Sequence, residues 1–229
     1  EDTSKAYKLK LFVKGDEYKF LGIKTSLHLF GTTNGGKFFL LGTDINGRDF
    51  FSRLMIGSRI SLFIGFIAIL ISVPLGLLYG GISGYLGGKV DIVMMRLAEA
   101  IMSIPSFYLL IILAGILPAN LTSTQRFIMI TAILAFVSWA SLSRIIRGMV
   151  LSIKTREYVL ASEVIGQSKL NIIIKHILPQ TLTFTIIAVS LSIPSYILSE
   201  SALSFIGLGI QQPDASWGNL LKDAQSYIV

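Results

Sequence analysis

Four long runs of uncharged, mostly apolar residues divide this sequence. They cover residues 60–82, 100–119, 127–143 and 177–199. An α-helix rises about 1.5 Å per residue, so a run of about 20 residues is long enough to cross the hydrocarbon core of a bilayer. The third run is the shortest, but Arg144 and Arg147 at its end can extend their charges to the interface. The pattern therefore predicts four membrane spans.

The N-terminal part of the chain, 1–41, follows a different pattern. Short runs rich in aromatic and β-branched residues lie at 7–13, 18–23, 27–30 and 37–41. Sequences typical of turns separate them at 14–16, 24–26 and 34–36. We therefore expect a small β-rich cap over residues 1–41 and a helical membrane domain over 42–229. Residues 50–59 carry apolar side chains on one helical face, which favours an interfacial segment before the first span.

Composition supports lipid as the main surroundings of the chain. Hydrophobic residues make up 52% of the sequence and charged residues only 14%, with a mean hydropathy of +0.70; soluble domains carry about 25% charged residues. The net charge of +7 suggests nucleic acid as a partner, but the basic residues form no stripe between aromatics. They gather instead at 1–60 and at 144–175, as in loops beside membrane spans. We expect a lipid bilayer as partner and no nucleic acid.

Basic residues also predict the orientation. The connection between the third and fourth runs contains Arg144, Arg147, Lys154, Arg156, Lys169 and Lys175. Only Glu157 and Glu163 oppose them, and lysine and arginine near span ends favour the cytoplasmic side. This places the loop at 154–176 in the cytoplasm, so residues 1–56 and 200–229 fall outside. The lysines within 1–56 do not oppose this orientation, because long loops translocate largely regardless of their charge. Glu99 and Glu200 fall at predicted span ends, where water is available.

Two series of small or polar residues follow helical periods. The first, Ala68, Ser72, Gly76, Gly80, Gly84 and Gly88, recurs every four residues and predicts close helix packing. The second comprises Thr181, Thr185, Ala188, Ser192, Ser195 and Ser199. Its hydroxyl groups either line a solute path, with Thr181, Thr185, Ser192, Ser195 and Ser199 as the candidates, or bond neighbouring helices. Pro105 and Pro194 are expected to kink the helices that contain them.

The cytoplasmic loop contains a short helical pattern from Glu157 to Gly166. Glycine readily adopts the left-handed conformation that ends many helices, so the helix should end at Gly166. Ala161 and Ser162 are small enough for a partner to approach the backbone closely. From these residues alone, an ordinary amphipathic loop remains the alternative.

Three motifs resemble one family of membrane proteins. Ala161, Ser162 and Gly166, followed by Leu178 and Pro179 before a span, resemble the EAA loop of ABC-importer permeases. Leu160 stands where that family usually has glutamate, and Ser162 where it usually has a second alanine. Residues 41–49 (LGTDINGRD) resemble the segment before the second span of the oligopeptide, dipeptide and nickel permeases. Their outer loop after the fifth span is similar to 201–218, with Ser204, Gly207, Gly209 and Trp217. Together the motifs, within 39–229, favour the C-type member of the paired permeases.

The resemblance implies a fold and a set of partners. The fold is an all-α membrane protein, a type I ABC-importer permease bundle in a prokaryotic inner membrane, here with a small β-rich insertion outside. Six spans are expected, of which this chain, as a fragment, supplies the second to the fifth. The implied partners are a homologous second permease subunit, two cytoplasmic ATPase subunits and an extracytoplasmic solute-binding protein. The ATPase-coupling loop then consists of Glu157, Tyr158, Ala161, Ser162, Gly166, Leu178 and Pro179.

Chemistry by the chain itself is not expected. The sequence has no G-x-x-x-x-G-K-[ST] pattern, so ATP and magnesium belong on the ATPase subunits and no cofactor on this chain. Cysteine is absent, and two isolated histidines, His28 and His176, make no metal site. A hydrolase using Ser204 with His176 is disfavoured, because the two fall at opposite membrane faces. We therefore predict no catalytic and no metal residues.

An ion-coupled secondary carrier is the main alternative transporter. Such carriers place ionisable residues near the bilayer midplane, and the cores of the four runs contain none. The favoured solute is a peptide by resemblance, and import of nickel or oligosaccharides by the same mechanism remains open.

Overall fold

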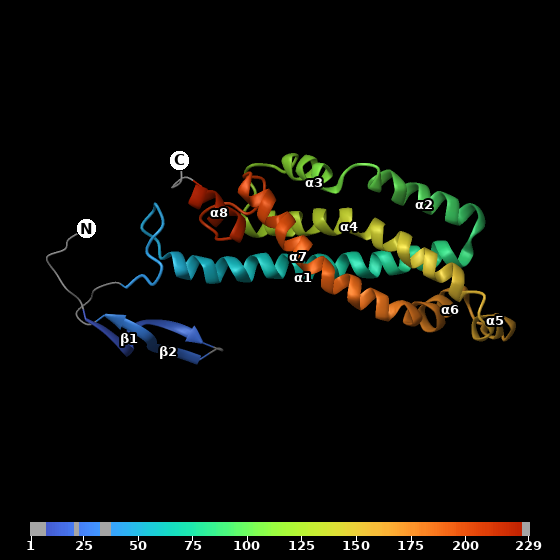
Figure 1. The fold of residues 1–229 in the computed structure, drawn as a ribbon, viewed down its shortest axis with the longest axis horizontal. Helices are drawn as coiled ribbons and strands as arrows, with labels where there is room; N and C mark the ends of the chain where they lie inside the picture. The colour runs from blue at the N-terminus through green and yellow to red at the C-terminus, as the bar shows by residue number, and fades with distance from the viewer. Residues whose placement is uncertain (1–7, 21–22, 33–37, 226–229) are drawn as a thin grey trace. The chain divides into compact units, whose positions relative to one another are not determined.

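The computed structural model describes residues 8–20, 23–32 and 38–225. The chain divides into two compact units, residues 1–52 and 53–229. Figure 1 shows the elements of each, a β-hairpin in the first and a bundle of helices in the second.

The first unit contains an antiparallel hairpin of β1 (Leu9–Phe20) and β2 (Ile23–Thr32). The expectation of strands here is confirmed, but the turns expected at 14–16 and 24–26 are wrong. Lys14 pairs with Leu27 and Tyr18 with Thr25, so both strands continue through those positions. A shift of register between Lys14 and Tyr18 accommodates the turn-like residues without ending the strand. The turn expected at 34–36 lies outside the described residues, and 38–41 form no strand.

The predicted first span lies inside α1 (Phe50–Leu86), a single helix of 37 residues. Residues 50–59 continue into the span without a break, so they form no separate interfacial helix. Pro74 lies within the helix. The polar residues at 52–53 and 58–59 do not interrupt the backbone ladder, because they are compatible with helical geometry.

The small-residue series on α1 packs against α4 (Ser123–Ile153). A Cβ at Gly76 would lie 2.9 Å from the Leu142 side chain, and one at Gly84 would lie 2.9 Å from the Arg147 carbonyl oxygen. A Cβ at Gly80 would overlap the carbonyl oxygen of Ser143. The predicted packing role of the series is therefore confirmed as far as Gly84. Gly88 lies beyond the end of α1 and begins the next helix.

The second predicted run is divided by a bend. Residues 100–119 comprise the end of α2 (Gly88–Met102), a break at 103–105 and α3 (Ser106–Gly115). The two helices meet at 78°. Because proline has no N–H and disfavours helical geometry in the residue before it, Pro105 stops α2 from continuing and caps α3.

The third and fourth predicted runs lie in longer helices. α4 begins with a reciprocal cap between Thr122 and Gln125 and extends well beyond 127–143 at its far end, to Ile153. The fourth run lies in α7 (Leu182–Phe205) and the residues before it. These are α6 (Lys169–Ile172), a π-helical turn η1 (Ile173–Ile177) and a 3-10 turn η2 (Leu178–Thr181), which continue into α7. Pro179 in η2 has no backbone N–H to donate. A break in the regular α-helical hydrogen-bond pattern is therefore favoured at this point.

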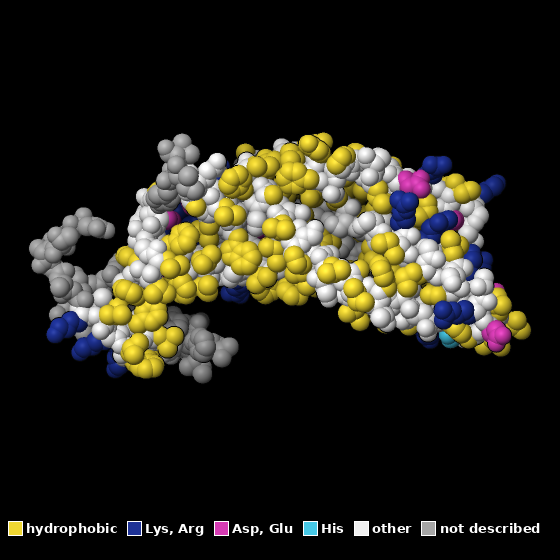
Figure 2. Space-filling view, in the orientation of Figure 1, with side chains coloured by type: hydrophobic (Ala, Val, Ile, Leu, Met, Phe, Trp, Pro, Cys, Tyr) yellow, Lys and Arg dark blue, Asp and Glu magenta, His cyan; other side chains and the backbone are white. Residues whose placement is uncertain are grey.

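Three described helices are long and apolar enough to cross a membrane: α1, α4 and the continuous segment Lys169–Phe205. The bent pair α2 and α3 makes a fourth if it is counted as one span. Many large apolar side chains on the bundle are exposed, among them Leu70, Ile116 and Leu191, and they cover much of the surface in Figure 2. Exposure of this kind suits lipid as the surrounding medium.

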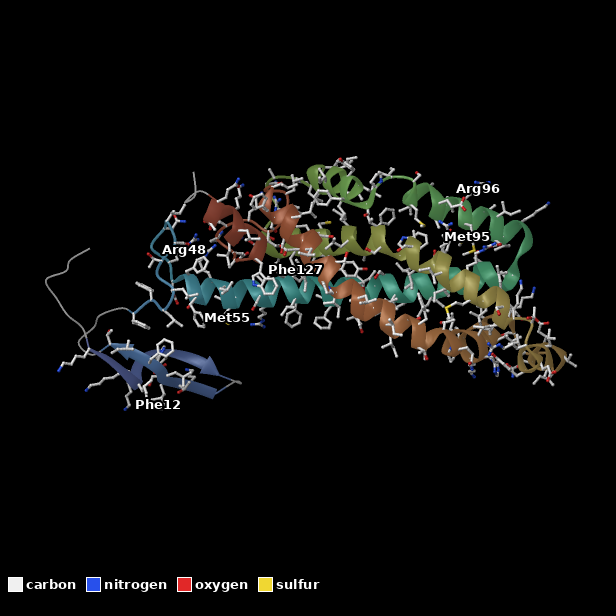
Figure 3. All side chains as sticks on the ribbon, viewed as in Figure 1. Phe12, Arg48, Met55, Met95, Arg96 and Phe127 are labelled. Carbon is white, nitrogen blue, oxygen red and sulfur yellow. The ribbon has the colours of Figure 1, made fainter. Side chains whose placement is uncertain are left out.

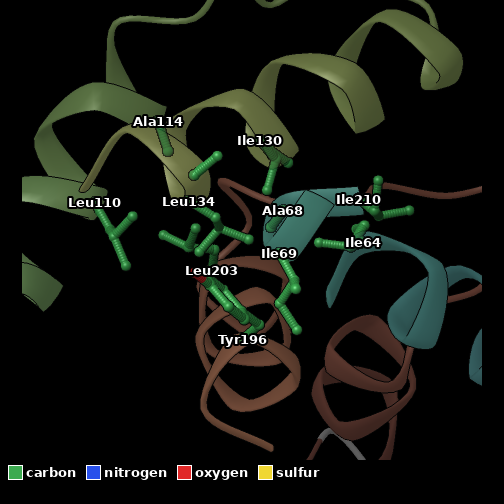
Figure 4. Close-up of a cluster of buried hydrophobic side chains, with 11 residues drawn as sticks. Ile64, Ala68, Ile69, Leu110, Ala114, Ile130, Leu134, Tyr196, Leu203 and Ile210 are labelled. Carbon is green, nitrogen blue, oxygen red and sulfur yellow. The ribbon is translucent and has the colours of Figure 1, made fainter. Parts of the chain in front are cut away.

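The bundle core lies where α1, α3, α4 and α7 meet. Figure 4 shows the cluster, to which Ile64, Leu110, Leu134 and Leu203 contribute. A smaller cluster of Met95, Ala98 and Ala140 joins α2 to α4, and Figure 3 shows Met95 beside Arg96 on α2. α5 (Glu157–Val164) and α8 (Trp217–Gln225) lie at opposite ends of the bundle in Figure 1.

Candidate functional site

The helix predicted in the 154–176 loop is α5, and its end has the expected geometry. Gly166 has a φ of +79°, in the left-handed region that favours glycine. Its N–H donates to the Glu163 carbonyl at 2.9 Å, and the N–H of Gln167 donates to the Ser162 carbonyl at 3.2 Å. These two bonds make a Schellman motif, which satisfies carbonyls that the helix end leaves open.

α5 buries one side and exposes the other. Val159 and Ser162 are buried, whereas Leu160, Val164 and Ile165 are exposed, Val164 to 87%. Leu170 and Ile174 in the following turns are exposed as well. We call the exposed residues Leu160, Val164, Ile165, Leu170 and Ile174 the end patch. An apolar patch at the end of a bundle, next to Lys169 and Lys175, is typical of a protein–protein contact.

Side chains hold α5 to the bundle. The Tyr85 hydroxyl, near the end of α1, donates to Glu163 Oε1 at 2.6 Å. His176 Nε2 and Gln167 Oε1 lie 2.9 Å apart, which ties the turn after α5 to η1. These two bonds connect α5 to α1 and to the segment that enters α7.

A cavity of about 450 Å³ lies among α1, α4, α7 and the bend between α2 and α3. Every described residue that lines it is uncharged. Its hydroxyl groups come from Ser72, Ser106, Ser138, Ser141, Ser192, Ser195, Tyr196 and Ser199. The Ser72 and Tyr196 hydroxyls lie 2.9 Å apart and join α1 to α7. Ser138, Ser141 and Ser192 donate to carbonyls of their own helices, so these hydroxyls offer the cavity acceptor lone pairs, spaced by apolar surface.

The hydroxyl series on the last span divides into two groups. Ser192, Ser195 and Ser199 lie at the cavity. Thr181 and Thr185 do not: they are buried, and their hydroxyls donate to the carbonyls of Leu178 and Thr181. The structure therefore brings three of the five candidate residues together and keeps the two threonines within the helix packing.

An ion pair joins three helices near α5. Arg147 of α4 donates from Nε to Asp91 Oδ1 of α2 at 2.6 Å and from Nη2 to Oδ2. The hydroxyl of Ser83 on α1 also donates to Asp91. Lys154 Nζ donates to the Gly84 carbonyl at 2.9 Å, beside the same joint. The Asp91 and Arg147 side chains are only partly exposed, and pairing and hydrogen bonds offset the loss of water around their charges.

The motif at 201–218 forms a tight loop at the other end of the bundle. Ser204 Oγ accepts from the Ile210 N–H at 2.8 Å, and Gly207 has a φ of +84°. A Cβ at Gly209 would overlap Ser204, so only glycine fits there. The backbone N–H of Trp217 donates to Ser61 of α1 at 3.3 Å, which fastens the far end of the loop to the bundle.

The motif at 41–49 is a compact turn. Asp44 Oδ1 accepts from the N–H groups of Asn46 and Arg48, both at 2.9 Å, and Oδ2 accepts from Arg48 Nε at 2.7 Å. Burial by itself raises the pKa of Asp44, but these bonds and the Arg48 charge outweigh it and lower the pKa below the ordinary value. The carboxylate is thus the centre of the turn.

A family model, "Binding-protein-dependent transport system inner membrane component", matches residues 72–229. The chain belongs to this family. The match includes α5, the cavity helices and the loop at 201–218. Family membership and the apolar helices together make this a membrane-embedded protein.

Curated relatives share more of the chain. The oligopeptide transport system permease protein OppC of Haemophilus influenzae is 45% identical over 192 residues, 84% of this chain and 59% of the relative. The dipeptide transport system permease protein DppC of Bacillus subtilis is 43% identical over 182 residues, 80% of the chain and 55% of the relative. OppC of Escherichia coli is 46% identical over 182 residues, which are 80% of this chain and 58% of the relative. The chain thus spans somewhat more than half the length of these permeases.

A solved structure shares the fold. The crystal structure of an amino acid ABC transporter with histidines aligns with a TM-score of 0.51 and 20% identity, over 78% of each chain. The fold class expected from the sequence, an all-α ABC-importer permease bundle with a small β insertion, is confirmed. The resemblance to the C-type peptide permeases is confirmed as well.

The permease motifs do not account for every functional-looking group. Glu200, expected at a water-accessible span end, is fully buried. Its burial follows from α7 extending to Phe205, past the predicted end of the span.

The pairing of Asp91 with Arg147 was not predicted either, since the two are far apart in the sequence. Single charged residues that border apolar runs are the signal that points to such pairs. Ser204 and His176 are held by separate partners, Glu200 and Gln167.

Proposed function

We propose that this chain is a permease subunit of an ATP-driven, binding-protein-dependent importer and that its solutes are peptides. The observation that carries the proposal is the 40–46% identity to permeases named for oligopeptide and dipeptide transport, over four fifths of the chain. The aligned part is long enough to include the bundle helices rather than one local motif.

The cavity supports a peptide as solute. The lone pairs of the serine and tyrosine hydroxyls can accept from peptide N–H groups, including those of Ser138, Ser141 and Ser192, whose own protons go to helix carbonyls. The described lining has no carboxylate, imidazole or thiol, the groups that hold nickel in proteins. Because the wall is uncharged, it does not select between acidic and basic peptides. Ser192, Ser195 and Ser199 are the members of the predicted series that would line the path, together with hydroxyls from α1 and α4.

The end patch supports coupling to an ATPase. We place α5 in the cytoplasm, with the exposed residues Glu157, Tyr158, Ala161 and Gly166 facing a groove on an ATPase subunit. Ser162, also expected at this contact, is buried against the bundle and would act only through the packing of α5. Leu178 and Pro179 lie at the junction where η2 enters α7, so a push on α5 reaches a cavity helix. Leu160, in the position where glutamate is usual, contributes apolar contact instead of charge.

The remaining partners complete the proposal. A second, homologous permease subunit would close the other side of the pathway, and two ATPase subunits would hold ATP and magnesium. A solute-binding protein would dock outside, on the side of the loop at 201–218. This chain itself would bind no cofactor and catalyse no reaction.

The test is transport by the complete importer in proteoliposomes. We expect uptake of a radiolabelled tripeptide that requires the binding protein on one side and ATP with magnesium on the other. An ionophore that removes ion gradients should leave the uptake unchanged, and an importer with inactive ATPase subunits is the matched control. Uptake that persists without ATP and collapses with the ionophore would establish an ion-coupled carrier instead. If the importer took up nickel or an oligosaccharide but no peptide, the proposed solute would be wrong.

A further inference from the structure

Glu200 on α7 is a fully buried carboxylate between two serines. Its Oε2 accepts from the Ser61 hydroxyl of α1 at 2.8 Å, and its Oε1 accepts from the Ser204 hydroxyl, one turn further along α7, at 2.6 Å. In the part of the chain that the structure describes, no ion pair is made by Glu200. A buried carboxyl group is costly unless it is hydrogen-bonded, and these two bonds give each of its oxygens a partner.

The hydrogen bonds of this network have a fixed direction. Ser204 Oγ accepts the backbone N–H of Ile210 at 2.8 Å, and Ser61 Oγ accepts the backbone N–H of Trp217 at 3.3 Å. Each serine therefore accepts from the backbone and donates its proton to Glu200. A carboxylate fits, because it only accepts. A glutamine would present an N–H₂ donor to one of the two serines, and the proton of that serine would lose its buried acceptor.

The network holds one loop at its middle, through Ile210, and just past its end, through Trp217. Ile210 lies within residues 206–216 and Trp217 follows them, so Glu200 links this segment to α1 and α7 at once. We call residues 206–216 the outer loop. Gly209 and Gly218 allow its close approach, because a Cβ at either position would overlap Ser204 or Ser201. Gln211, Gln212 and Pro213 are exposed, so the network fixes the shape of an accessible surface.

We propose that Glu200 is a positioning residue that holds the outer loop in the shape that receives the solute-binding protein. This inference rests on the proposed function. Its consequence is that the carboxylate acts on the encounter with the binding protein rather than on ATP turnover.

The test measures ATP hydrolysis by the complete importer against the concentration of its binding protein. For Glu200→Gln we expect the half-saturating concentration to rise about tenfold, the effect of one lost buried hydrogen bond to a charged group. The maximal rate and the rate without binding protein should stay as in the wild type. Ser61→Ala, which leaves the Ser204 bond in place, should give a rise in the same direction.

Two matched controls accompany these variants. Ser190→Ala removes an α7 hydroxyl that donates only to its own helix, to the Ile186 carbonyl. Glu99→Gln neutralises an exposed glutamate. Both should leave the half-saturating concentration unchanged. Should Glu200→Gln fail to assemble, Ser61→Ala decides the question.

The outcomes separate this inference from the proposed function. If the wild type is stimulated and the network variants saturate at the wild-type concentration, the positioning role is wrong. A lower maximal rate at unchanged half-saturation indicates a purely structural role and overturns it too. If the binding protein does not stimulate the wild type at all, the proposed function fails and this inference with it.

Discussion

Arg147 Nε lies 2.6 Å from Asp91 Oδ1, and this contact joins α4 to α2 at the end of the bundle that bears α5. The guanidinium meets the carboxylate with two nitrogens, a geometry that fixes direction as well as distance. Ser83 completes the joint from α1. The contact therefore links three helices at the end of the bundle where α5 is attached.

Replacing Asp91 by Asn should loosen this joint. The side chains are partly exposed, Arg147 to 33% and Asp91 to 12%, so we expect a loss of about 2 kcal/mol rather than that of a fully buried pair. Thermal unfolding of the purified protein measures it. Glu99→Gln, which breaks the exposed pair with Arg96, is the control and should change little. A double-mutant cycle of Asp91→Asn with Arg147→Gln that shows no coupling energy would contradict the account.

Gly80 should not tolerate a side chain. A methyl group there overlaps the carbonyl oxygen of Ser143, so α1 and α4 must separate, at a cost of about 1–3 kcal/mol for Gly80→Ala. The melting temperature in detergent should fall accordingly. Gly115→Ala at the end of α3, where a Cβ meets nothing within 4 Å, is the control. Equal melting temperatures for the two variants would refute close packing at Gly80.

Gly166 should be needed for coupling. An L-residue at φ +79° costs about 1–2 kcal/mol, so Gly166→Ala should loosen the end of α5. We expect ATP-driven uptake to fall several-fold while the protein remains in the membrane. Gly166→Asn should retain more activity, since asparagine tolerates this conformation better. Gly148→Ala on α4 is the control, in ordinary helix with nothing near its Cβ. Unchanged uptake in Gly166→Ala would argue against a rigid α5.

Asp44 predicts a pH dependence in the turn at 41–49. Its pKa is lowered in the folded state, so its contribution is present above the ordinary carboxyl value of 3.8 and is lost as the pH falls through the lower folded value. Amide exchange at Asn46 and Arg48 should be slower in the wild type than in Asp44→Asn at neutral pH. The difference should vanish in strong acid. A difference that grows on acidification would contradict the stabilising role of the carboxylate.

The sequence predicts the helices better than their ends. Apolar runs locate the cores of α1, α4 and α7, because a membrane span must satisfy its own backbone. The apolar runs do not predict how far the helices continue past them. Charged residues such as Arg126 and Arg147 end an apolar run but are compatible with a helix, and both lie inside α4. The bend at Pro105 is predicted only as a kink. The angle of 78° between α2 and α3 depends on packing against other helices, so the apolar run at 100–119 does not predict it.

The candidate site divides in the same way. The helix end at Gly166 and the close packing of the α1 glycines were predictable. Glycine adopts left-handed backbone geometry more easily than other residues, and its missing side chain lets a second helix approach. The cavity positions of Ser192, Ser195 and Ser199 could not be separated from those of Thr181 and Thr185 by period alone. All five follow one helical period, and the packing of the neighbouring helices decides which of them meet the cavity. The burial of Glu200 depends on its contact with Ser61, which is distant in the sequence.

The orientation of the bundle is the claim that a single measurement tests most directly. The 229 residues contain no cysteine, so a cysteine introduced among them reports one position in this part of the protein. Val164→Cys marks the end patch and Gln211→Cys the outer loop, and both positions are exposed.

Intact cells are treated with a membrane-impermeant maleimide. The account predicts labelling of Gln211→Cys at once and of Val164→Cys only after the membrane is permeabilised. Labelling of Val164→Cys in intact cells would place α5 outside, where no ATPase could reach it, and would contradict the proposed coupling.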